Sequence, residues 1–300
     1  MKNAPADVSS VPIAVWRPGT IGDYIVLTKP RLNVLVVATS AAGYYLGAPR
    51  GIQLLPMAAA VAGTALVAGG AAVLNQVYER DTDALMRRTR LRPLPDRRVG
   101  PRDATIFGIA LAAIGIASLV LAANLLAAAL TALTIVVYLF VYTPMKRLSS
   151  AATLVGAVPG ALPPLIGWTA AHGMIAPGGL ALFAIVFLWQ IPHFMAIAWM
   201  YRDDYRQAGF PMLPVVEPDG RRTGRQAVLY AVALVPASLM PTMVGISGWP
   251  YFWIALTLGV VMLWLSVRFA STRSDTAARR LFFGSIVYLP LIWGAMIAFH

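Results

Sequence analysis

Residues 104–142 read ATIFGIALAAIGIASLVLAANLLAAALTALTIVVYLFVY and contain no charged side chain. Residues 227–267 form a second uncharged run, which ends at Arg268. A helix needs about 20 apolar residues to cross the hydrocarbon core of a bilayer, so each run is long enough to lie in lipid. Both runs are far longer than the alternating segments of about ten residues that build a membrane β-barrel. The sequence therefore predicts an all-α, polytopic membrane protein.

The composition of the whole chain agrees with this fold class. Of its 300 residues, 59% are hydrophobic and 12% are charged, and the mean hydropathy is +0.71. These values lie outside the range of soluble globular proteins. The chain has no cysteine, which excludes disulfides, thiolate metal sites and cysteine nucleophiles. Apolar runs predict nine spanning helices, at residues 32–48, 54–78, 104–122, 125–142, 151–170, 179–200, 227–246, 251–268 and 281–299.

The basic residues are distributed unevenly between the predicted spans. If the amino terminus is inside, all of the 24 Lys and Arg residues except Arg50 fall on the inside. This distribution follows the positive-inside rule and accounts for the net charge of +12 without a nucleic-acid partner. We expect a cytoplasmic tail over residues 1–23, a single transmembrane domain over residues 24–300, and a carboxyl terminus outside.

Two long inside connections, residues 79–103 and 201–226, hold most of the residues that could carry chemistry. Each follows a span that runs from outside to inside, and the two spans are four helices apart. Glu79 and Asp204 occupy similar places at these two span ends. This weak internal repeat predicts two four-helix halves and a ninth helix, arranged around a central cavity.

The first connection begins with a regular pattern of polar residues. Asn75, Glu79 and Asp83 are spaced four residues apart, so on a continuing helix they share one face. Like charges placed in this way repel one another, and a positive group is expected between them. Oxygen ligands of this kind suit Mg²⁺, which usually bridges carboxylates to substrate phosphates.

The second connection begins with Tyr201-Arg-Asp203-Asp204-Tyr205. Five of the twelve acids in the chain lie in these two windows, namely Glu79, Asp81, Asp83, Asp203 and Asp204. Acids contribute little to membrane orientation, so their concentration indicates a shared site. We expect catalytic roles for Asn75, Glu79, Asp83, Asp203 and Asp204, and metal binding by Asn75, Glu79, Asp83 and Asp204.

A structural interpretation of each acidic cluster stays open at this point. The first cluster could be an ordinary interfacial helix end whose acids pair with nearby arginines, namely Arg80, Arg87 and Arg88. The second could be a charged cap on a helix.

Basic residues close to these acids could bind phosphate. Arginine offers two parallel donors to a phosphate, and lysine offers a point charge. Acids that hold Mg²⁺ beside such cations predict a diphosphate site, for which the membrane provides room for a long apolar tail. The alternative is that most of these cations are topological anchors. The candidate substrate-binding residues are Arg88, Arg92, Tyr142, Lys146, Arg147, His193 and Tyr201.

His193 lies within the predicted span at 179–200, next to Pro192. An ionisable residue inside a membrane helix is a functional candidate by default. On a continuous helix His193 would share a face with Asp204 and lie roughly 16 Å deeper. The alternative is that His193 is a hydrogen-bonded packing residue.

Taken together, these segments resemble the UbiA superfamily of intramembrane prenyltransferases. The first superfamily motif is an Asn followed by two acids at four-residue intervals. The finer resemblance, over about residues 24–299, is to the members that farnesylate heme. It rests on Leu27-Thr-Lys-Pro-Arg31, Asp83-Ala-Leu-Met-Arg-Arg-Thr89, Arg92-Pro-Leu-Pro95, Gly160-Ala-Leu-Pro-Pro-Leu-Ile-Gly-Trp168, Trp189 to Phe194 and Tyr201 to Pro214.

The chain departs from the superfamily pattern at three places. Glu79 stands where most members have Asp. The two acids of the second motif fall on Tyr201 and Tyr205 in this register, as in the heme-farnesylating members. Ala152 stands where many relatives have Asn, so an amide contact from that helix is not expected here.

The resemblance implies transfer of the farnesyl group of farnesyl diphosphate to a vinyl group of heme B, with Mg²⁺, to give heme O. It also implies a bacterial inner membrane protein, in membrane lipid, with its active-site loops in the cytoplasm and an interaction with a heme A synthase. His193 would then ligate the heme iron or orient the porphyrin.

Three alternatives compete with this interpretation. The same site could prenylate a quinone or chlorin precursor. A transporter of ions or protons could use intramembrane acids, but its acids should lie near the middle of the bilayer. The chain could also be a structural subunit of an oxidase assembly.

Overall fold

The computed structural model describes residues 19–48 and 51–300, and the regular elements in these ranges are all helices. Eight helical segments are long and apolar enough to cross a membrane, and one of them, Leu125–Met145, combines α5, η1 and α6. The bent pair α1 and α2 makes a ninth if it is counted as one span. This confirms the prediction of an all-α, polytopic membrane protein with about nine spans.

The long helices are α2 (Pro30–Leu46), α3 (Leu54–Asp83), α4 (Pro101–Ala122), α5 (Leu125–Ile135), α7 (Ala152–His172), α8 (Pro177–Met200), α11 (Arg221–Met243), α12 (Trp249–Thr272) and α13 (Asp275–Ala298). The shorter ones are α1 (Ile21–Leu27), the π-helix η1 (Val136–Tyr142), α6 (Thr143–Met145), α9 (Arg202–Gln207) and α10 (Leu213–Val216).

Several helices begin earlier or end later than the apolar runs predicted. α11 begins at Arg221 rather than at residue 227, and α3 continues to Asp83 rather than ending at residue 78. Hydropathy marks only the part of a helix that is in hydrocarbon, whereas backbone hydrogen bonding continues into the headgroup region. The predicted tail, residues 1–23, lies mostly outside the described residues, and its last three residues begin α1.

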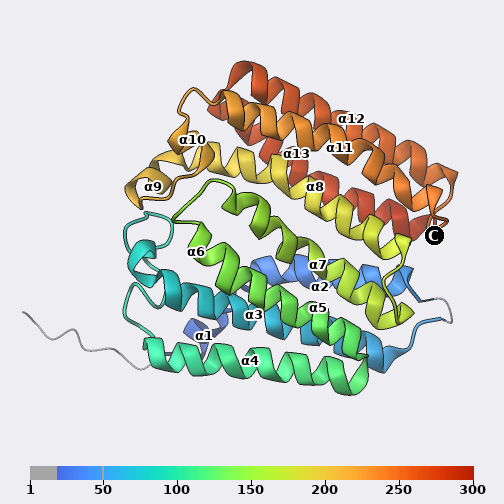
Figure 1. Cartoon of the computed structure of the whole chain (residues 1–300), viewed down its shortest axis with the longest axis horizontal. Coiled ribbons are helices and arrows are strands. Elements are labelled where there is room, and N and C mark those ends of the chain that lie inside the picture. The colour runs from blue at the N-terminus through green and yellow to red at the C-terminus, as the bar shows by residue number, and fades with distance from the viewer. Residues whose placement is uncertain (1–18, 49–50) are drawn as a thin grey trace, which may run out of the picture.

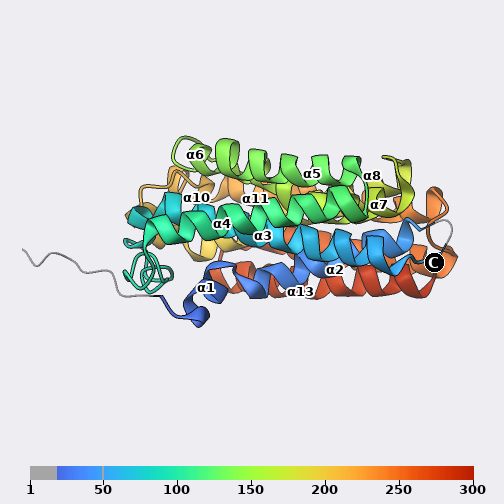
Figure 2. The ribbon, with the colours of Figure 1, turned by 90° about the horizontal axis from the view of Figure 1, so that it is seen from below.

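The long helices run side by side along one axis of the molecule (Figure 1). Loops with α6, α9 and α10 lie at one end, and the carboxyl terminus lies at the other. Figure 2 shows α5 and α6 on one side of the molecule and α1, α2 and α13 on the opposite side. The polar end of the molecule is therefore built from both halves of the chain.

The seam between α2 and α7 joins the two halves. A Cβ atom at Gly43 would overlap the carbonyl of Pro164, and one at Gly167 would overlap the carbonyl of Ser40. Glycine at both positions lets the two backbones approach closely, as is typical of helix pairs in membranes. Substitution of either glycine would push the halves apart.

The apolar core is larger in the second half of the chain. One cluster of buried side chains extends over α7, α8, α11, α12 and α13, with Trp189, Leu234 and Tyr288 among its members. In the first half, the last turns of α3 instead bury polar side chains. A buried polar group is stable only when it has hydrogen-bond or ionic partners, so this end of α3 must be surrounded by such partners.

The chain bends by 55° between α1 and α2. Lys29 adopts a left-handed backbone conformation there, with a φ of 51°, and Pro30 is the first residue of α2. The side-chain amide of Gln76 on α3 donates a 2.7 Å hydrogen bond to the carbonyl of Leu27, which is left without a helical partner by the break. The bend is therefore anchored to α3, one residue from Asn75.

α8 ends at Met200, and this corrects an assumption made from the sequence. Tyr201 has φ −110° and ψ 22°, which are not helical values, and α9 begins as a separate short helix at Arg202. His193 and Asp204 therefore do not lie on one continuous helix face. The predicted separation of three helical turns along one face therefore does not apply to these two side chains.

Candidate active site

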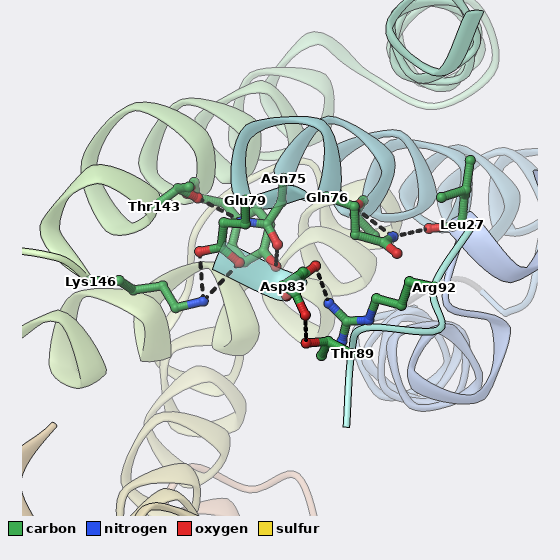
Figure 3. A network of polar contacts seen from close by, with 11 residues as sticks. Leu27, Asn75, Gln76, Glu79, Asp83, Thr89, Arg92, Thr143 and Lys146 are labelled. Atoms are coloured by element: carbon green, nitrogen blue, oxygen red, sulfur yellow. Dashed lines mark hydrogen bonds and ion pairs between the residues drawn. The ribbon is translucent and has the colours of Figure 1, made fainter. Parts of the chain in front are cut away.

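The polar face predicted from the sequence exists on α3. Asn75, Glu79 and Asp83 all lie on this helix, and their exposed fractions are 2%, 4% and 1%. Figure 3 shows their side chains close together, with Lys146 beside Glu79 and Arg92 beside Asp83. Buried carboxylates need counter-charges, and each of the two has one.

Glu79 pairs with Lys146. The ammonium group of Lys146 donates to both carboxylate oxygens, at 2.8 and 3.0 Å. It also lies 5.3 Å from the ring centre of Tyr142 and 5.2 Å from that of Phe210. Burial works against the charge of Lys146, but Tyr142 and Glu79 outweigh it and raise the pKa of Lys146 above its ordinary value. The lysine is therefore cationic at neutral pH.

Asp83 pairs with Arg92. The guanidinium group donates a 2.7 Å hydrogen bond to a carboxylate oxygen of Asp83. The hydroxyl of Thr89 donates to the backbone carbonyl of Asp83 at 2.7 Å, and this bond folds the segment after α3 back over the helix end. Arg92 is held beside the helix in this way, and its side chain is 26% exposed.

Asn75 is held by residues around η1. Its side-chain amide donates to the hydroxyl of Thr143 at 3.1 Å, and that hydroxyl donates to the carbonyl of Tyr138 at 2.7 Å. The phenol of Tyr138 approaches the amide oxygen of Asn75 at 3.4 Å. Residues 136–142 form a π-helix, and π-helical turns are frequent at functional sites because they re-aim side chains.

A lysine at the bend between α1 and α2 lies close to this site. Lys29 is near enough to Glu79, Asp83, Arg92 and Lys146 to interact with them electrostatically. The two ion pairs balance their own charges, so a diphosphate would have to draw the cations away from the carboxylates.

Several contacts at this site were not expected from the sequence. Lys29, Gln76, Tyr138 and Thr143 were not predicted to be site residues. A possible signal was that each is a polar residue within or next to an apolar run, where an unpaired polar group is costly. The alternative that these acids pair with Arg87 and Arg88 was wrong. Glu79 pairs with Lys146, and Asp83 pairs with Arg92.

The other predicted cations lie around this group. Arg147 donates a 2.5 Å hydrogen bond to the hydroxyl of Thr82 and lies over the ring of Tyr78. Arg88 lies over the ring of Tyr201, 5.1 Å from its centre. Arg88 therefore joins the segment after α3 to the segment after α8, and the two long connections, residues 79–103 and 201–226, meet there.

The second acidic cluster is built differently. Asp203 is exposed, and its carboxylate accepts a 2.7 Å hydrogen bond from Arg206 on the same short helix. Asp204 is half-buried and forms no ion pair with the described residues. Across residues 19–48 and 51–300, no three His, Asp or Glu side chains come together as a metal site. A bound Mg²⁺ would here need phosphate oxygens in addition to one or two carboxylates.

His193 packs against α13. Its ring is stacked between Trp189 and Phe282, with centres 5.1 and 5.0 Å away. Its Nδ1 lies 2.7 Å from the hydroxyl of Ser285, and that hydroxyl donates to the carbonyl of Phe282 at 2.6 Å. When the serine proton is directed at Phe282, Nδ1 is the donor to Ser285, and in that tautomer the lone pair of the neutral ring is on Nε2.

Comparison with known proteins places this arrangement in a family. Residues 36–287 match the model of the UbiA prenyltransferase family. The chain is 48% identical over 284 residues to a protoheme IX farnesyltransferase of Solibacter usitatus, with 92% of this chain and 97% of that protein covered. It is 44% identical to a protoheme IX farnesyltransferase of Koribacter versatilis, with 95% and 96% covered.

A solved structure shares the fold. It is that of a UbiA homolog from Archaeoglobus fulgidus, described as bound to GPP and Mg²⁺. The TM-score is 0.66 at 16% identity, and the match covers 92% of this chain and 99% of the other. The arrangement of helices is therefore preserved where most of the sequence has changed.

Proposed function

The chain belongs to the UbiA prenyltransferase family, and from this premise we propose that it joins the farnesyl group of farnesyl diphosphate to a vinyl group of heme B. The farnesyl carbon–oxygen bond breaks, diphosphate leaves, and water adds to the resulting carbocation with loss of a proton, which gives the hydroxyl group of heme O. The names of relatives that are 48% and 44% identical over nearly the whole chain support this activity.

One structural observation carries the proposal for the diphosphate site. Two buried carboxylates on α3 are each held by a cation from a different segment, Glu79 by Lys146 and Asp83 by Arg92. Removal of either cation would leave a buried carboxylate unpaired. A bound diphosphate with Mg²⁺ would replace these pairs, because the diphosphate would take the cations and the metal would take the carboxylates.

In this exchange, Lys146 and Arg92 turn to the oxygens of the diphosphate. Their positive charge stabilises the charge that develops on the diphosphate as the farnesyl carbon–oxygen bond breaks. Glu79 and Asp83, released from the cations, would be the residues that hold the metal. Mg²⁺, when bound, supplies further neutralisation of the leaving diphosphate.

Asn75 is the remaining member of the α3 face. Its amide oxygen is approached by the phenol of Tyr138, and its nitrogen is bound to Thr143. These contacts fix the orientation of the amide. We assign to Asn75 the role of a neutral oxygen ligand beside the two carboxylates, in agreement with the ligand preference of Mg²⁺.

Asp203 and Asp204 belong to the same proposed site through the contact between Arg88 and Tyr201. Asp204 is the better metal candidate of the two, because Asp203 already pairs with Arg206 on its own helix. Arg88 and Arg147 then remain as contacts for the diphosphate from the rim of the site.

His193 is proposed to serve the porphyrin. The ring is oriented by Ser285 through Nδ1, which leaves a lone pair on Nε2, and metal-binding histidines usually have their other nitrogen fixed in this way. Trp189 and Phe282 keep the ring from turning. Nε2 would therefore be able to ligate the iron of heme B.

The membrane orientation belongs to this proposal too. The basic residues between the spans favour an inside location for the site end of the molecule, in a bacterial inner membrane. Farnesyl diphosphate would reach the site from the cytoplasm with its tail in lipid. The product is very apolar, so direct transfer to a heme A synthase in the same membrane fits its chemistry.

The identity of the acceptor is tested by pigment analysis. Membranes of a host that lacks its own enzyme should contain heme O when this chain is expressed and heme B alone when it is not. A prenylated quinone or chlorin without heme O would contradict the assignment and favour the second acceptor class.

A further inference from the structure

Two cavities lie along the seam between α12 and α13, away from the α3 site. The first, of about 170 Å³, is lined on its polar side by Arg268, Thr272, Ser274, Thr276 and Arg280. The second, of about 290 Å³, is lined by apolar side chains and one glycine, with a tyrosine at its edge. These residues are Leu258, Val261, Met262, Phe283, Gly284, Val287 and Tyr288.

The two cavities follow one another along the helices. On α13, Arg280 lines the first cavity and Gly284 lines the second, and four residues correspond to about one helical turn, or roughly 6 Å. On α12, Leu265 lines the first and Val261 lines the second. The polar cavity thus lies nearer the loop end of the hairpin and the apolar cavity farther along the two helices. The side chain of Leu265 lies against Gly284 where the two cavities adjoin.

The polar cavity carries uncompensated positive charge. Both Arg268 and Arg280 are exposed, and neither forms an ion pair with a carboxylate in the part of the chain that the structure describes. Asp275 is the acid of this hairpin, but it is bound to Arg202 at 2.8 Å and to the indole nitrogen of Trp199 at 2.9 Å. Its charge is therefore paired with α8 and α9, and the cavity keeps two guanidinium groups. The hydroxyl of Thr272 donates to the carbonyl of Arg268 at 2.8 Å, and that of Ser274 accepts from the backbone nitrogen of Ala277.

The apolar cavity opens on the outer surface of the bundle. Phe283 and Val287 are 62% and 57% exposed, which places them on the lipid-facing side. Trp264, at the boundary between the two cavities, is 56% exposed, and tryptophan is enriched at the level of the lipid headgroups. Along the seam, charged groups, a tryptophan and apolar side chains therefore follow one another in the order of the headgroup, interface and acyl chain of a phospholipid.

We propose that the seam between α12 and α13 binds an anionic phospholipid of the leaflet at the site end of the molecule. The phosphate lies between Arg268 and Arg280, and the hydroxyls of Ser274 and Thr276 donate to the polar headgroup. One acyl chain follows the apolar cavity past Gly284. Basic pockets between membrane helices favour anionic headgroups through charge-assisted hydrogen bonds.

Free phosphate would satisfy the arginines but would leave the apolar cavity unused. The succession of a basic polar cavity and an apolar cavity along one seam is therefore the argument for a lipid. The seam contains none of the residues assigned to the prenyl transfer site, so this proposal stands independently of the proposed function.

Brominated lipids test the proposal in vesicles of purified full-length protein. Bromine quenches a tryptophan only on contact, and the signal of Trp264 is obtained as the difference between the wild type and Trp264→Phe. Brominated phosphatidylglycerol should quench this signal at a mole fraction at least threefold lower than brominated phosphatidylcholine does.

Arg268→Gln together with Arg280→Gln should abolish that preference. The matched control is Arg273→Asn with Arg279→Gln, which removes the same charge from the same hairpin outside the cavity, and asparagine tolerates the left-handed backbone at residue 273. The control should keep the preference. Equal quenching by both lipids in the wild type, or an equal loss of preference in both double variants, would overturn the proposal.

Discussion

The two acidic clusters lie at matching places in the chain but differ in structure. At the end of α3, Glu79 and Asp83 are buried and each pairs with a cation from another segment. On α9, Asp203 is exposed and pairs with Arg206 on its own helix. Burial with long-range pairing fixes the position of a charge, whereas an exposed pair within one helix contributes little.

This difference follows from how the two spans end. α3 remains helical to Asp83, so its acids stay on the face that packs against η1 and α6. α8 ends at Met200, and the second pair of acids turns away on α9. The comparison teaches that the internal repeat preserves the location of a cluster without preserving its role. We expect the α3 cluster to dominate catalysis.

The largest effect is expected at α3. Glu79→Gln and Asp83→Asn should each reduce the rate of heme O formation at least 100-fold, about 2.7 kcal/mol of barrier. Asp81→Asn is the matched control, because its side chain is 84% exposed on the same helix. Its rate should stay near that of the wild type. Rates within about threefold of wild type in both α3 variants would remove the metal assignment.

The pairing itself is tested by Lys146→Met. Glu79 would then be buried without a counter-charge, and the free energy of unfolding should fall by about 3 kcal/mol. The Michaelis constant for farnesyl diphosphate should rise about tenfold, roughly 1.4 kcal/mol.

The double variant Lys146→Met with Glu79→Gln separates these two effects. It should recover most of the stability in a thermal unfolding assay and none of the activity. Recovery of activity together with stability would show that the pair has only a structural role.

Substitution of the two acids of α9 should affect the rate of heme O formation unequally. Asp204→Asn should lower the rate about tenfold, and Asp203→Asn should remain within about twofold of wild type because an exposed ion pair contributes less than about 1 kcal/mol. Rates measured over a range of Mg²⁺ concentrations would show a raised metal requirement for the first variant alone. The reverse order would assign the metal to Asp203.

The smallest effect on the Michaelis constant for farnesyl diphosphate is expected from His193→Ala. The Michaelis constant for heme B should rise severalfold, while that for farnesyl diphosphate should change by less than about twofold. The heme spectrum of the purified variant should change as well, since an axial nitrogen is lost. A lower melting temperature with both constants unchanged would show that His193 is a packing residue.

Much of the fold could be predicted from the sequence. The apolar runs locate the spans because the bilayer imposes a minimum helix length, and the four-residue spacing places Asn75, Glu79 and Asp83 on one face. The break after Met200 could not be predicted, because the hydrophobic pattern ends there whether or not the helix continues. The prediction that His193 and Asp204 share one face of a continuous helix was wrong for this reason.

The partners of the acids could not be predicted from local sequence. Lys146 is 67 residues from Glu79, and the choice of Lys146 over Arg80 or Arg87 depends on how η1 and α6 pack against α3. Likewise, Lys29 comes to the site only because the chain bends between α1 and α2. Packing between segments that are far apart in the chain determines which residues pair, and the spacing of residues in the sequence does not reveal that packing.

The central claim is that the buried end of α3 is the diphosphate site. Its most direct test is equilibrium binding of an unreactive thiodiphosphate analogue of farnesyl diphosphate to purified protein, with Mg²⁺ and after chelation. Binding to the wild type and to Asp203→Asn should require Mg²⁺, and Glu79→Gln with Asp83→Asn should lose at least 100-fold in affinity, about 2.7 kcal/mol. Equal affinity in the α3 double variant, or full affinity without the metal, would contradict the account.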